Sequence, residues 1–298
     1  MMSFANLWSY LKERFPVVNM LLFGILFLTV YSVASYTRKQ FGVSPLFISG
    51  GIIATISFFF RLRVFDEMKD FAIDKINHPQ RVLQSGRITV TQLQYTAAIL
   101  FCMEAVWTIT AGVPCIICWF AAIAYSLLMR YEFFIPVLLK KSLMWYAFTH
   151  MLIMPFIICW LWWGLVQQNG WNTYFWLLCL LSIAGGFSFE IARKIHTPDA
   201  EKATIDSYSK SLGFNTSIIL ANLLLAGGVI TQFFLLNYIR AQYWAYIFIV
   251  ALFLATLFFY ITVIKSPKEK KLRHAEILVS LFMLVSYVSV IIQILVLK

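Results

Sequence analysis

The sequence predicts an all-α, polytopic membrane protein with about nine transmembrane helices in a bundle. The composition is the first reason, because 61% of the 298 residues are hydrophobic and only 12% are charged. So few polar residues could not cover the surface of soluble domains of this total length. The second reason is a series of long segments without Asp, Glu, Lys or Arg, since a helix needs about 20 apolar residues to cross a bilayer.

These uncharged segments account for eight of the nine helices. The longest has room for two helices and is divided by Gln167-Gln168-Asn169-Gly170. A ninth helix, 91–111, contains one charge, Glu104, and Gly112-Val113-Pro114 separates it from the next helix. The uncharged segments are 15–37, 40–60, 105–129, 142–189, 211–239, 241–264 and 277–297.

The elements outside these segments are short. Residues 1–14 place Phe4, Leu7, Trp8 and Leu11 at helical spacing, which predicts a helix lying at the membrane interface. The first apolar segment is too long for a signal peptide, and no cleavable signal is evident. We expect a single domain over residues 1–298.

The charges gather on one side of the predicted membrane. With the N-terminus in the cytoplasm, 20 of the 24 Lys and Arg residues are cytoplasmic, and so are all of the 13 acidic residues except Glu104. The positive-inside rule supports this orientation. The net charge of +11 therefore indicates membrane topology and a polar site, and no nucleic acid is expected as a partner. We expect a multi-pass protein of the cell (inner) membrane whose active site and connecting loops face the cytoplasm.

A stretch between two apolar segments, residues 61–87, carries the clearest chemical pattern. Asp66, Asp70 and Asp74 recur every four residues, and Glu67 adjoins the first. This spacing puts the three carboxylates on one face of a helix, roughly 6 Å apart along its axis. Because Mg²⁺ prefers carboxylate and phosphate oxygens, it would relieve their repulsion. The basic side chains nearby suit a diphosphate: Arg61, Arg63, Lys75 and Arg81.

Two motifs in this stretch resemble those of the UbiA-type intramembrane prenyltransferases. Asp66-Glu67-x-x-Asp70-x-x-x-Asp74 is similar to the first aspartate-rich motif of the family, N-D-x-x-D-x-x-x-D, with Asp66 at the Asn position. Arg81-Val82-Leu83-Gln84-Ser85-Gly86 resembles R-P-L-x-S-G, with Val82 in place of proline. The resemblance implies nine helices and Mg²⁺-dependent transfer of an isoprenyl group from a prenyl diphosphate to a small hydrophobic acceptor, often aromatic.

Two further helix ends resemble the family in part. Tyr125 is followed five residues later by Arg130, which is similar to a tyrosine and cation pair that contacts diphosphate. The family has a second motif, D-x-x-x-D, at the end of the sixth helix. Here Glu190 occupies the position of its first carboxylate, but Lys194 occupies the position of its last. Lys194 lies one turn after Glu190, so the two can pair or Lys194 can contact diphosphate directly. This departure leaves a second metal and the acceptor class in doubt.

The resemblance and the spacing together give one set of candidate site residues. We expect metal ligands and catalytic carboxylates at the end of the second helix, a further catalytic carboxylate at the sixth, and cations for the diphosphate. The metal candidates are Asp66, Glu67, Asp70 and Asp74; the catalytic candidates are Asp66, Asp70, Asp74 and Glu190; the diphosphate candidates are Arg63, Arg81, Arg130 and Lys194.

Several alternatives remain open from the sequence. A transporter would string polar residues through several helices, whereas the charges here collect at one face. A phosphotransferase acting on CDP-alcohols needs Asp-Gly, which does not occur. A non-catalytic relative that binds diphosphate lipids is compatible with the weak second motif. Glu104 and His150 each have a functional and a packing interpretation, and Cys115-x-x-Cys118 is best interpreted as packing.

Overall fold

The computed structural model is a bundle of helices, and it describes residues 3–166, 170–201 and 206–296. Within these ranges, nine spans are long and apolar enough to cross a membrane. The prediction of an all-α membrane protein with about nine transmembrane helices is confirmed. The polar residues 167–169, expected to divide the longest apolar segment, lie outside the described ranges.

In the first half of the chain, capping residues and glycines mark the boundaries of several helices. Thr89 caps the helix that follows it, because its side chain accepts a hydrogen bond from the Gln92 backbone N–H. Gly112, with φ of 103°, separates two antiparallel spans in a backbone conformation that suits glycine. The elements are α1 (Phe4–Arg14), α2 (Val17–Arg38), α3 (Pro45–Asn77), α4 (Val90–Ala111), α5 (Val113–Arg130), η1 (Glu132–Phe134) and α6 (Pro136–Lys140).

The fifth span is broken into two helices, α7 (Leu143–Met151) and α8 (Ile153–Leu165). Pro155 lies three residues after the break at Leu152. A proline has no N–H to donate to the carbonyl four residues earlier, here that of Met151, and its ring crowds that carbonyl. The break therefore has a local cause, and the two parts still cross as one span.

The second half of the chain forms four more spans, and Gly213, with φ of 88°, connects α10 to α11. The elements are α9 (Thr173–Arg193), η2 (Pro198–Ala200), α10 (Tyr208–Leu212), α11 (Phe214–Tyr238), α12 (Tyr243–Lys265), α13 (Glu269–Ile291) and a final π-helical turn, η3 (Ile292–Val296).

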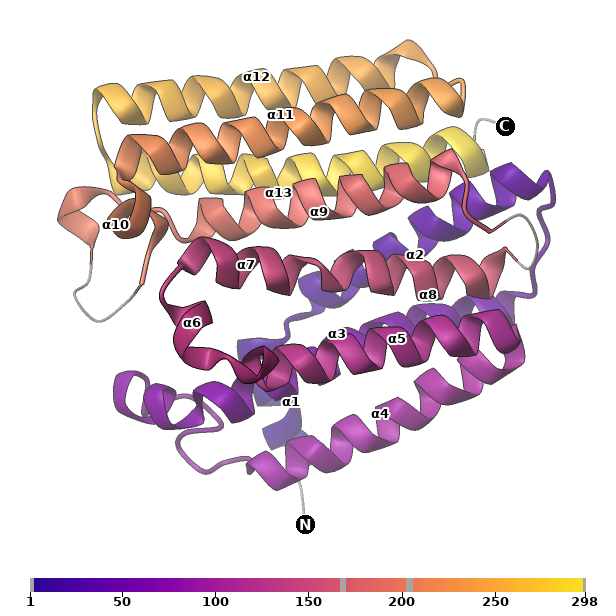
Figure 1. Ribbon diagram of the computed structural model, residues 1–298, viewed down its shortest axis with the longest axis horizontal. Helices are drawn as coiled ribbons and strands as arrows, with labels where there is room; N and C mark the ends of the chain where they lie inside the picture. The colour runs from indigo at the N-terminus through magenta and orange to yellow at the C-terminus, as the bar shows by residue number, and fades with distance from the viewer. Residues whose placement is uncertain (1–2, 167–169, 202–205, 297–298) are drawn as a thin grey trace.

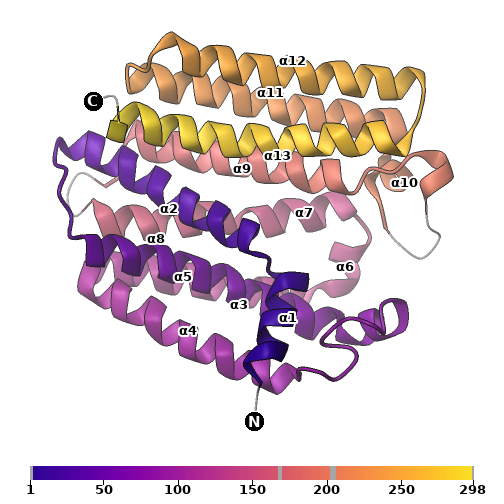
Figure 2. The ribbon, with the colours of Figure 1, turned by 180° about the vertical axis from the view of Figure 1, so that it is seen from behind.

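The spans form two groups, and α2 lies between them and contacts both (Figures 1 and 2). In one group α3, α4, α5 and α8 pack together, and in the other α9, α11, α12 and α13 do. α2 packs against both α3 and α13, which brings the first and last spans side by side. The largest buried apolar cluster joins the two groups and includes Phe27, Phe58, Trp160 and Leu178.

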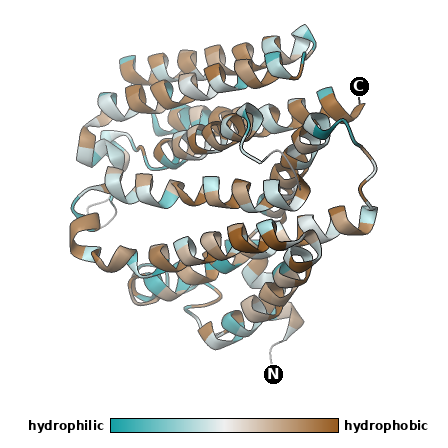
Figure 3. Cartoon of the chain, turned by 45° about the vertical axis from the view of Figure 1, so that its right-hand side comes forward, coloured by the Kyte–Doolittle hydropathy of each residue, from teal (hydrophilic) through white to brown (hydrophobic). Residues whose placement is uncertain are grey.

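One end of the bundle collects the polar elements, and we call it the polar end. It is formed by the C-terminal ends of α3, α5, α9 and α12, together with α6 and α10 (Figure 1, left). Hydrophilic colour is concentrated in the connecting segments, whereas the long helices are mostly hydrophobic (Figure 3). Large apolar side chains such as Ile99, Ile117 and Phe248 are exposed on the outside, as expected of a surface in contact with lipid.

Candidate functional site

The acidic residues 66–74 lie on the last turns of α3, at the polar end. Their exposure differs, although their spacing is regular. The Glu67 side chain is 1% exposed and that of Asp74 15%, whereas that of Asp66 is 49% exposed and Asp70 is exposed. Two of the four carboxylates are therefore open and two are enclosed.

The two enclosed carboxylates are neutralised by arginines. Glu67 Oε1 lies 2.6 Å from Arg14 Nε and 2.7 Å from Arg63 Nη2. Asp74 Oδ2 lies 2.7 Å from Arg81 Nη1 and 3.5 Å from Arg14 Nη2. Arg14, at the end of α1, thus bridges both carboxylates. These contacts relieve much of the repulsion that the sequence spacing creates, and they hold Arg63 and Arg81 beside the acidic face.

The two open carboxylates are the ones that suit a divalent cation. Asp66 lies 3.6 Å from Lys69, and Asp70 forms no ion pair with any described residue. In the part of the chain that the structure describes, no three His, Cys, Asp or Glu side chains are grouped as a metal site. Mg²⁺ commonly binds one or two carboxylates and completes its coordination with water and substrate phosphate. Asp66 and Asp70 fit that pattern, whereas Glu67 and Asp74 face arginines.

Lys69 connects the acidic face to an aromatic cluster on the neighbouring helices. Its Nζ lies 2.5 Å from the hydroxyl oxygen of Tyr146 on α7. The Tyr146 ring stacks on His150 at 4.0 Å, and Phe133 meets His150 edge-on at 6.2 Å. Tyr125 contacts Phe133 in turn, with ring centroids 5.5 Å apart. Aromatic faces therefore lie close to the open carboxylates.

The turn that presents Phe133 is strained. Glu132, Phe133 and Phe134 all have positive φ, between 49° and 59°. A left-handed conformation costs about 1–2 kcal/mol for each residue that is not glycine. The packing of Phe133 and an ion pair of 3.3 Å between Glu132 and Lys140 offset part of that cost. Strain of this kind is concentrated at functional sites, which agrees with the location of this turn beside the aromatic cluster.

His150 has one ring nitrogen engaged and one free. Nδ1 lies 2.7 Å from the backbone oxygen of Tyr146, and because a carbonyl can only accept, Nδ1 carries the proton. Nε2 is buried and has no hydrogen-bond partner among the described residues. The lone pair on Nε2 of the neutral imidazole is therefore not engaged by any described residue.

The second acidic position, at the end of α9, is held by its own basic neighbours. Glu190 Oε1 lies 2.7 Å from Lys194 Nζ, which is the pairing that the spacing predicts, and Glu190 Oε2 accepts a hydrogen bond from Arg193. Burial raises the pKa of the nearby Tyr208 phenol, and the charge of Glu190 raises that pKa further. Within the described ranges, no hydrogen bond or ion pair joins α9 to α3, so these contacts bring Glu190 and Lys194 together but not with the α3 carboxylates.

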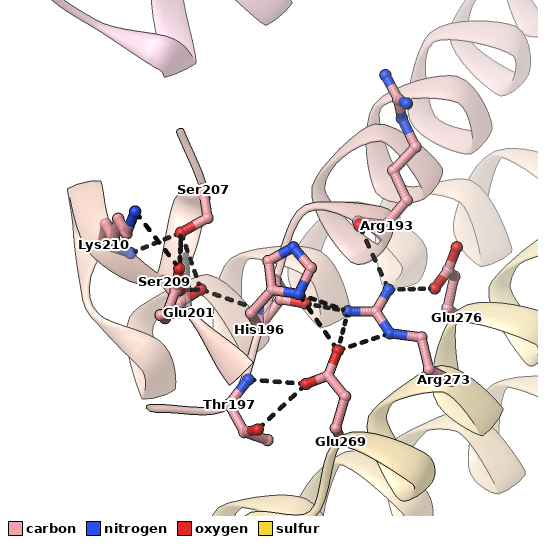
Figure 4. A network of polar contacts seen from close by, with 11 residues as sticks. Arg193, His196, Thr197, Glu201, Ser207, Ser209, Lys210, Glu269, Arg273 and Glu276 are labelled. Carbon is pink, nitrogen blue, oxygen red and sulfur yellow. Dashed lines mark hydrogen bonds and ion pairs between the residues drawn. The ribbon is translucent and has the colours of Figure 1, made fainter. Parts of the chain in front are cut away.

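The link after α9 is fastened to α13 by a network of polar contacts (Figure 4). Glu269 accepts hydrogen bonds from the backbone N–H and the hydroxyl of Thr197, at 2.9 and 3.1 Å. Arg273 donates to the backbone oxygens of Arg193 and Ile195, at 3.3 and 2.6 Å. The position of Lys194 thus depends on α13 as well as on its own helix.

Arg130 and Arg61 lie on another side of α3. The Arg130 guanidinium stands over the rings of Phe65 and Tyr131, at 5.0 and 5.3 Å. Arg61, expected beside the carboxylates, instead pairs at 3.1 Å with Glu104, which also accepts a hydrogen bond from Trp119. Glu104 is therefore part of a buried ion pair between α3 and α4. Both arginines line a cavity of about 320 Å³.

Sequence reasoning missed the partners that come from distant segments. From the sequence, residues 1–14, which include Arg14, are expected only to form an interfacial helix, and no pattern indicates Tyr146. Lys69 was visible inside the acidic stretch, where its position three residues after Asp66 signals a helical ion pair. No local signal joins Arg61 to Glu104 or Arg14 to Glu67.

Comparisons with known proteins agree on the family. The model of the UbiA prenyltransferase family matches residues 25–284. The structure of a digeranylgeranylglyceryl phosphate synthase shares 20% identity, with a TM-score of 0.68 over 97% of this chain and 98% of that one. The apo structure of a UbiA homolog from Aeropyrum pernix K1 shares 11% identity, with a TM-score of 0.65 over 91% and 96%. No curated protein matches the sequence.

The two structural similarities are at low identity and show the fold, whereas the family match covers most of the chain. This chain belongs to the UbiA prenyltransferase family, whose members transfer a prenyl group from a prenyl diphosphate to an acceptor.

Proposed function

We propose that the protein is a Mg²⁺-dependent prenyltransferase whose diphosphate site lies at the end of α3. One observation carries this proposal: Asp66 and Asp70 are open, while the neighbouring carboxylates hold cations beside them. Bound Mg²⁺ would supply charge neutralisation of the diphosphate leaving group, with Asp66 and Asp70 as its protein ligands.

The cations around the carboxylates have a second role in this proposal. Glu67 and Asp74 orient the side chains of Arg63 and Arg81 through one guanidinium nitrogen each. The other N–H groups of the two guanidinium groups can donate hydrogen bonds to phosphate oxygens. Glu190 orients Lys194 in the same way at the end of α9. Arg130 is the fourth candidate from the sequence, but it lies against Phe65 in a cavity between α3 and α4, so we do not include it in the proposed diphosphate site.

The aromatic cluster suits the organic half of the reaction. Departure of diphosphate leaves an allylic cation, and aromatic faces stabilise cations by about 0.5–2 kcal/mol each. Tyr146, Phe133 and Tyr125 offer such faces next to Lys69 and Asp66. An electron-rich acceptor, small and hydrophobic or aromatic, then attacks the cation.

An aromatic acceptor must lose a proton after the new carbon–carbon bond forms. His150 Nε2 has a free lone pair, and Nδ1–H is fixed on the Tyr146 carbonyl. We assign this proton to His150, which then becomes an imidazolium stacked on the Tyr146 ring.

We also propose an orientation with the polar end in the cytoplasm, within the cell (inner) membrane. The distribution of Lys and Arg supports it, since 20 of the 24 fall in the sequence segments expected on the cytoplasmic side.

The test uses purified protein in nanodiscs with isoprenyl diphosphates of increasing length and a panel of phenolic and quinol-type acceptors. We expect release of diphosphate and a prenylated acceptor, detected by mass spectrometry, and loss of both when EDTA removes Mg²⁺. Tight binding of prenyl diphosphate without release, for every acceptor, would contradict the enzyme and favour a lipid-binding relative.

A further inference from the structure

The cavity beside Arg130 is separate from the carboxylate face of α3. It lies between α3 and α4, and its apolar walls include Val64, Phe65, Ala98 and Phe101. Asp66 and Lys69, by contrast, face α7, where Lys69 meets Tyr146. The cavity volume of about 320 Å³ is within the range of ligand pockets, about 300–1,000 Å³.

The charges in this cavity favour an anion. Arg61 is more than nine-tenths buried and is neutralised by Glu104, but its Nε has no hydrogen-bond partner among the described residues. Arg130 is half-buried and forms no hydrogen bond or ion pair within the described ranges; only the rings of Phe65 and Tyr131 accompany it. Two arginines and one carboxylate leave one positive charge without a counterion among the described residues, and a bound anion would supply it.

The location favours an amphiphile over a soluble anion. Tyr95 and Ile99 on α4, close to the lining residues of that helix, are 70% and 62% exposed on the lipid-facing surface. Its lining includes Arg130, the last residue of α5, and Gln94, in the second turn of α4, so the cavity lies toward the polar end, where lipid headgroups are expected. Basic pockets between transmembrane helices bind the phosphates of anionic lipids.

We propose that this cavity is a binding site for an anionic phospholipid, with the lipid phosphate on Arg130 and the start of one acyl chain against Phe65, Ala98 and Phe101. The bound lipid completes the packing of α3 against α4 and α5. This site is distinct from the diphosphate site and does not depend on the proposed reaction.

The test measures lipid retention by delipidated protein in a neutral detergent. Dioleoylphosphatidylglycerol and dioleoylphosphatidylcholine are added at equal concentration, and retained lipid is counted by native mass spectrometry. We expect the wild-type protein to retain the anionic lipid about tenfold better, a difference of about 1.4 kcal/mol, because Arg130 donates charged hydrogen bonds to the lipid phosphate. Arg130→Gln should bring the ratio close to one.

Two variants separate the site from general surface charge. Lys268→Gln removes an exposed cation at the same end of the bundle, outside the cavity, and should keep the lipid preference. Ala98→Phe fills the cavity without changing the charge and should abolish the preference for the anionic lipid. Circular dichroism checks that this variant is folded. An equal loss in Lys268→Gln and Arg130→Gln would overturn the proposal in favour of surface attraction.

A second outcome distinguishes the lipid from the prenyl diphosphate. If Arg130→Gln leaves the lipid preference unchanged but raises KM for prenyl diphosphate, Arg130 belongs to the diphosphate site and the lipid proposal is wrong. Binding of inorganic diphosphate by the wild-type protein at the expense of phosphatidylglycerol would likewise overturn it, since the two sites would be one.

Discussion

At the scale of single residues, the site consists of carboxylates that differ in their partners. Asp70 forms no ion pair with any described residue, whereas Glu67 is buried between Arg14 and Arg63. Both guanidinium groups contact Oε1 of Glu67, and its Oε2 is buried without a hydrogen-bond partner among the described residues. In our proposal the metal is therefore placed on the more exposed Asp66 and Asp70, although the four acidic residues look alike in the sequence.

Asp70→Asn tests this division directly. The change removes a charge and keeps the shape, so the protein should remain folded, while turnover should fall by about 100-fold or more, because a metal supplies several kcal/mol to such a transition state. Prenyl transfer by the purified variant is the measurement. Asp199→Asn, at an exposed acidic residue of the same end, is the control and should keep wild-type activity. Full turnover in Asp70→Asn would remove the motif from the site.

Lys194 provides the second residue-scale prediction. Its ammonium pairs with Glu190 at 2.7 Å, and in the proposed reaction it meets the diphosphate in place of a second metal ion. Lys194→Met should lower the affinity for diphosphate by about tenfold, with the Mg²⁺ dependence of activity still showing one site. Isothermal titration with a non-hydrolysable prenyl diphosphate analogue gives the affinity. Unchanged affinity and turnover would make Lys194 a positive-inside anchor only.

At the scale of elements, α1 is part of the site as well as an interfacial helix. Tyr10 and Phe15 pack with Phe60 and Val82 in one apolar cluster, and Glu13 accepts a hydrogen bond from the Val82 backbone N–H. Arg14 then reaches both Glu67 and Asp74. The last turns of α3 and the link after it are thus held by a helix that precedes the first span.

Arg14→Gln should therefore destabilise the end of α3. Glu67 would keep Arg63 but lose its contact of 2.6 Å with Arg14, at a cost of about 1–3 kcal/mol. We expect a lower thermal unfolding midpoint in detergent and faster proteolysis of the link at residues 78–88. Lys12→Gln, on the same helix, is the matched control. If the two variants unfold alike, the bridge contributes nothing to stability.

At the scale of the whole molecule, alternate helix ends meet at one end of the bundle (Figure 1). Most of the described charged residues belong to the segments that end there or connect there. Because neighbouring spans are antiparallel, the ends of α3 and α9 lie on the same side of the membrane, and the link before α9 lies on the other. The fold thereby puts both acidic helix ends at the same end of the bundle. A single domain over residues 1–298 remains a prediction.

Labelling from one side checks this topology. Single cysteines at Asn77, Asp199 and Trp171 are treated with a membrane-impermeant maleimide in intact cells and in inverted vesicles, against the parent chain as background. Positions 77 and 199 should react only in inverted vesicles, and position 171 only in intact cells. Reaction of positions 77 and 171 from the same side would be incompatible with the antiparallel spans.

The sequence by itself determined the class of fold, the number of spans and the family motif. These follow from local properties: the apolar length needed to cross a bilayer, and a four-residue spacing that puts side chains on one helical face. The contact between Glu190 and Lys194 was predictable for the same reason, because its partners are one turn apart. The break at Leu152 was not expected from the sequence, but it also has a local cause, Pro155.

Only the tertiary structure decided which acidic residues are open. Arg14 and Glu67 are 53 positions apart, and Arg61 and Glu104 are 43 apart, so no periodicity connects them. Their pairing depends on which faces of α1, α3 and α4 pack together, and that depends on the fit of many apolar side chains at once. The sequence thus located the acidic motif, whereas helix packing assigned Asp66 and Asp70 to the open face and Glu67 to the interior.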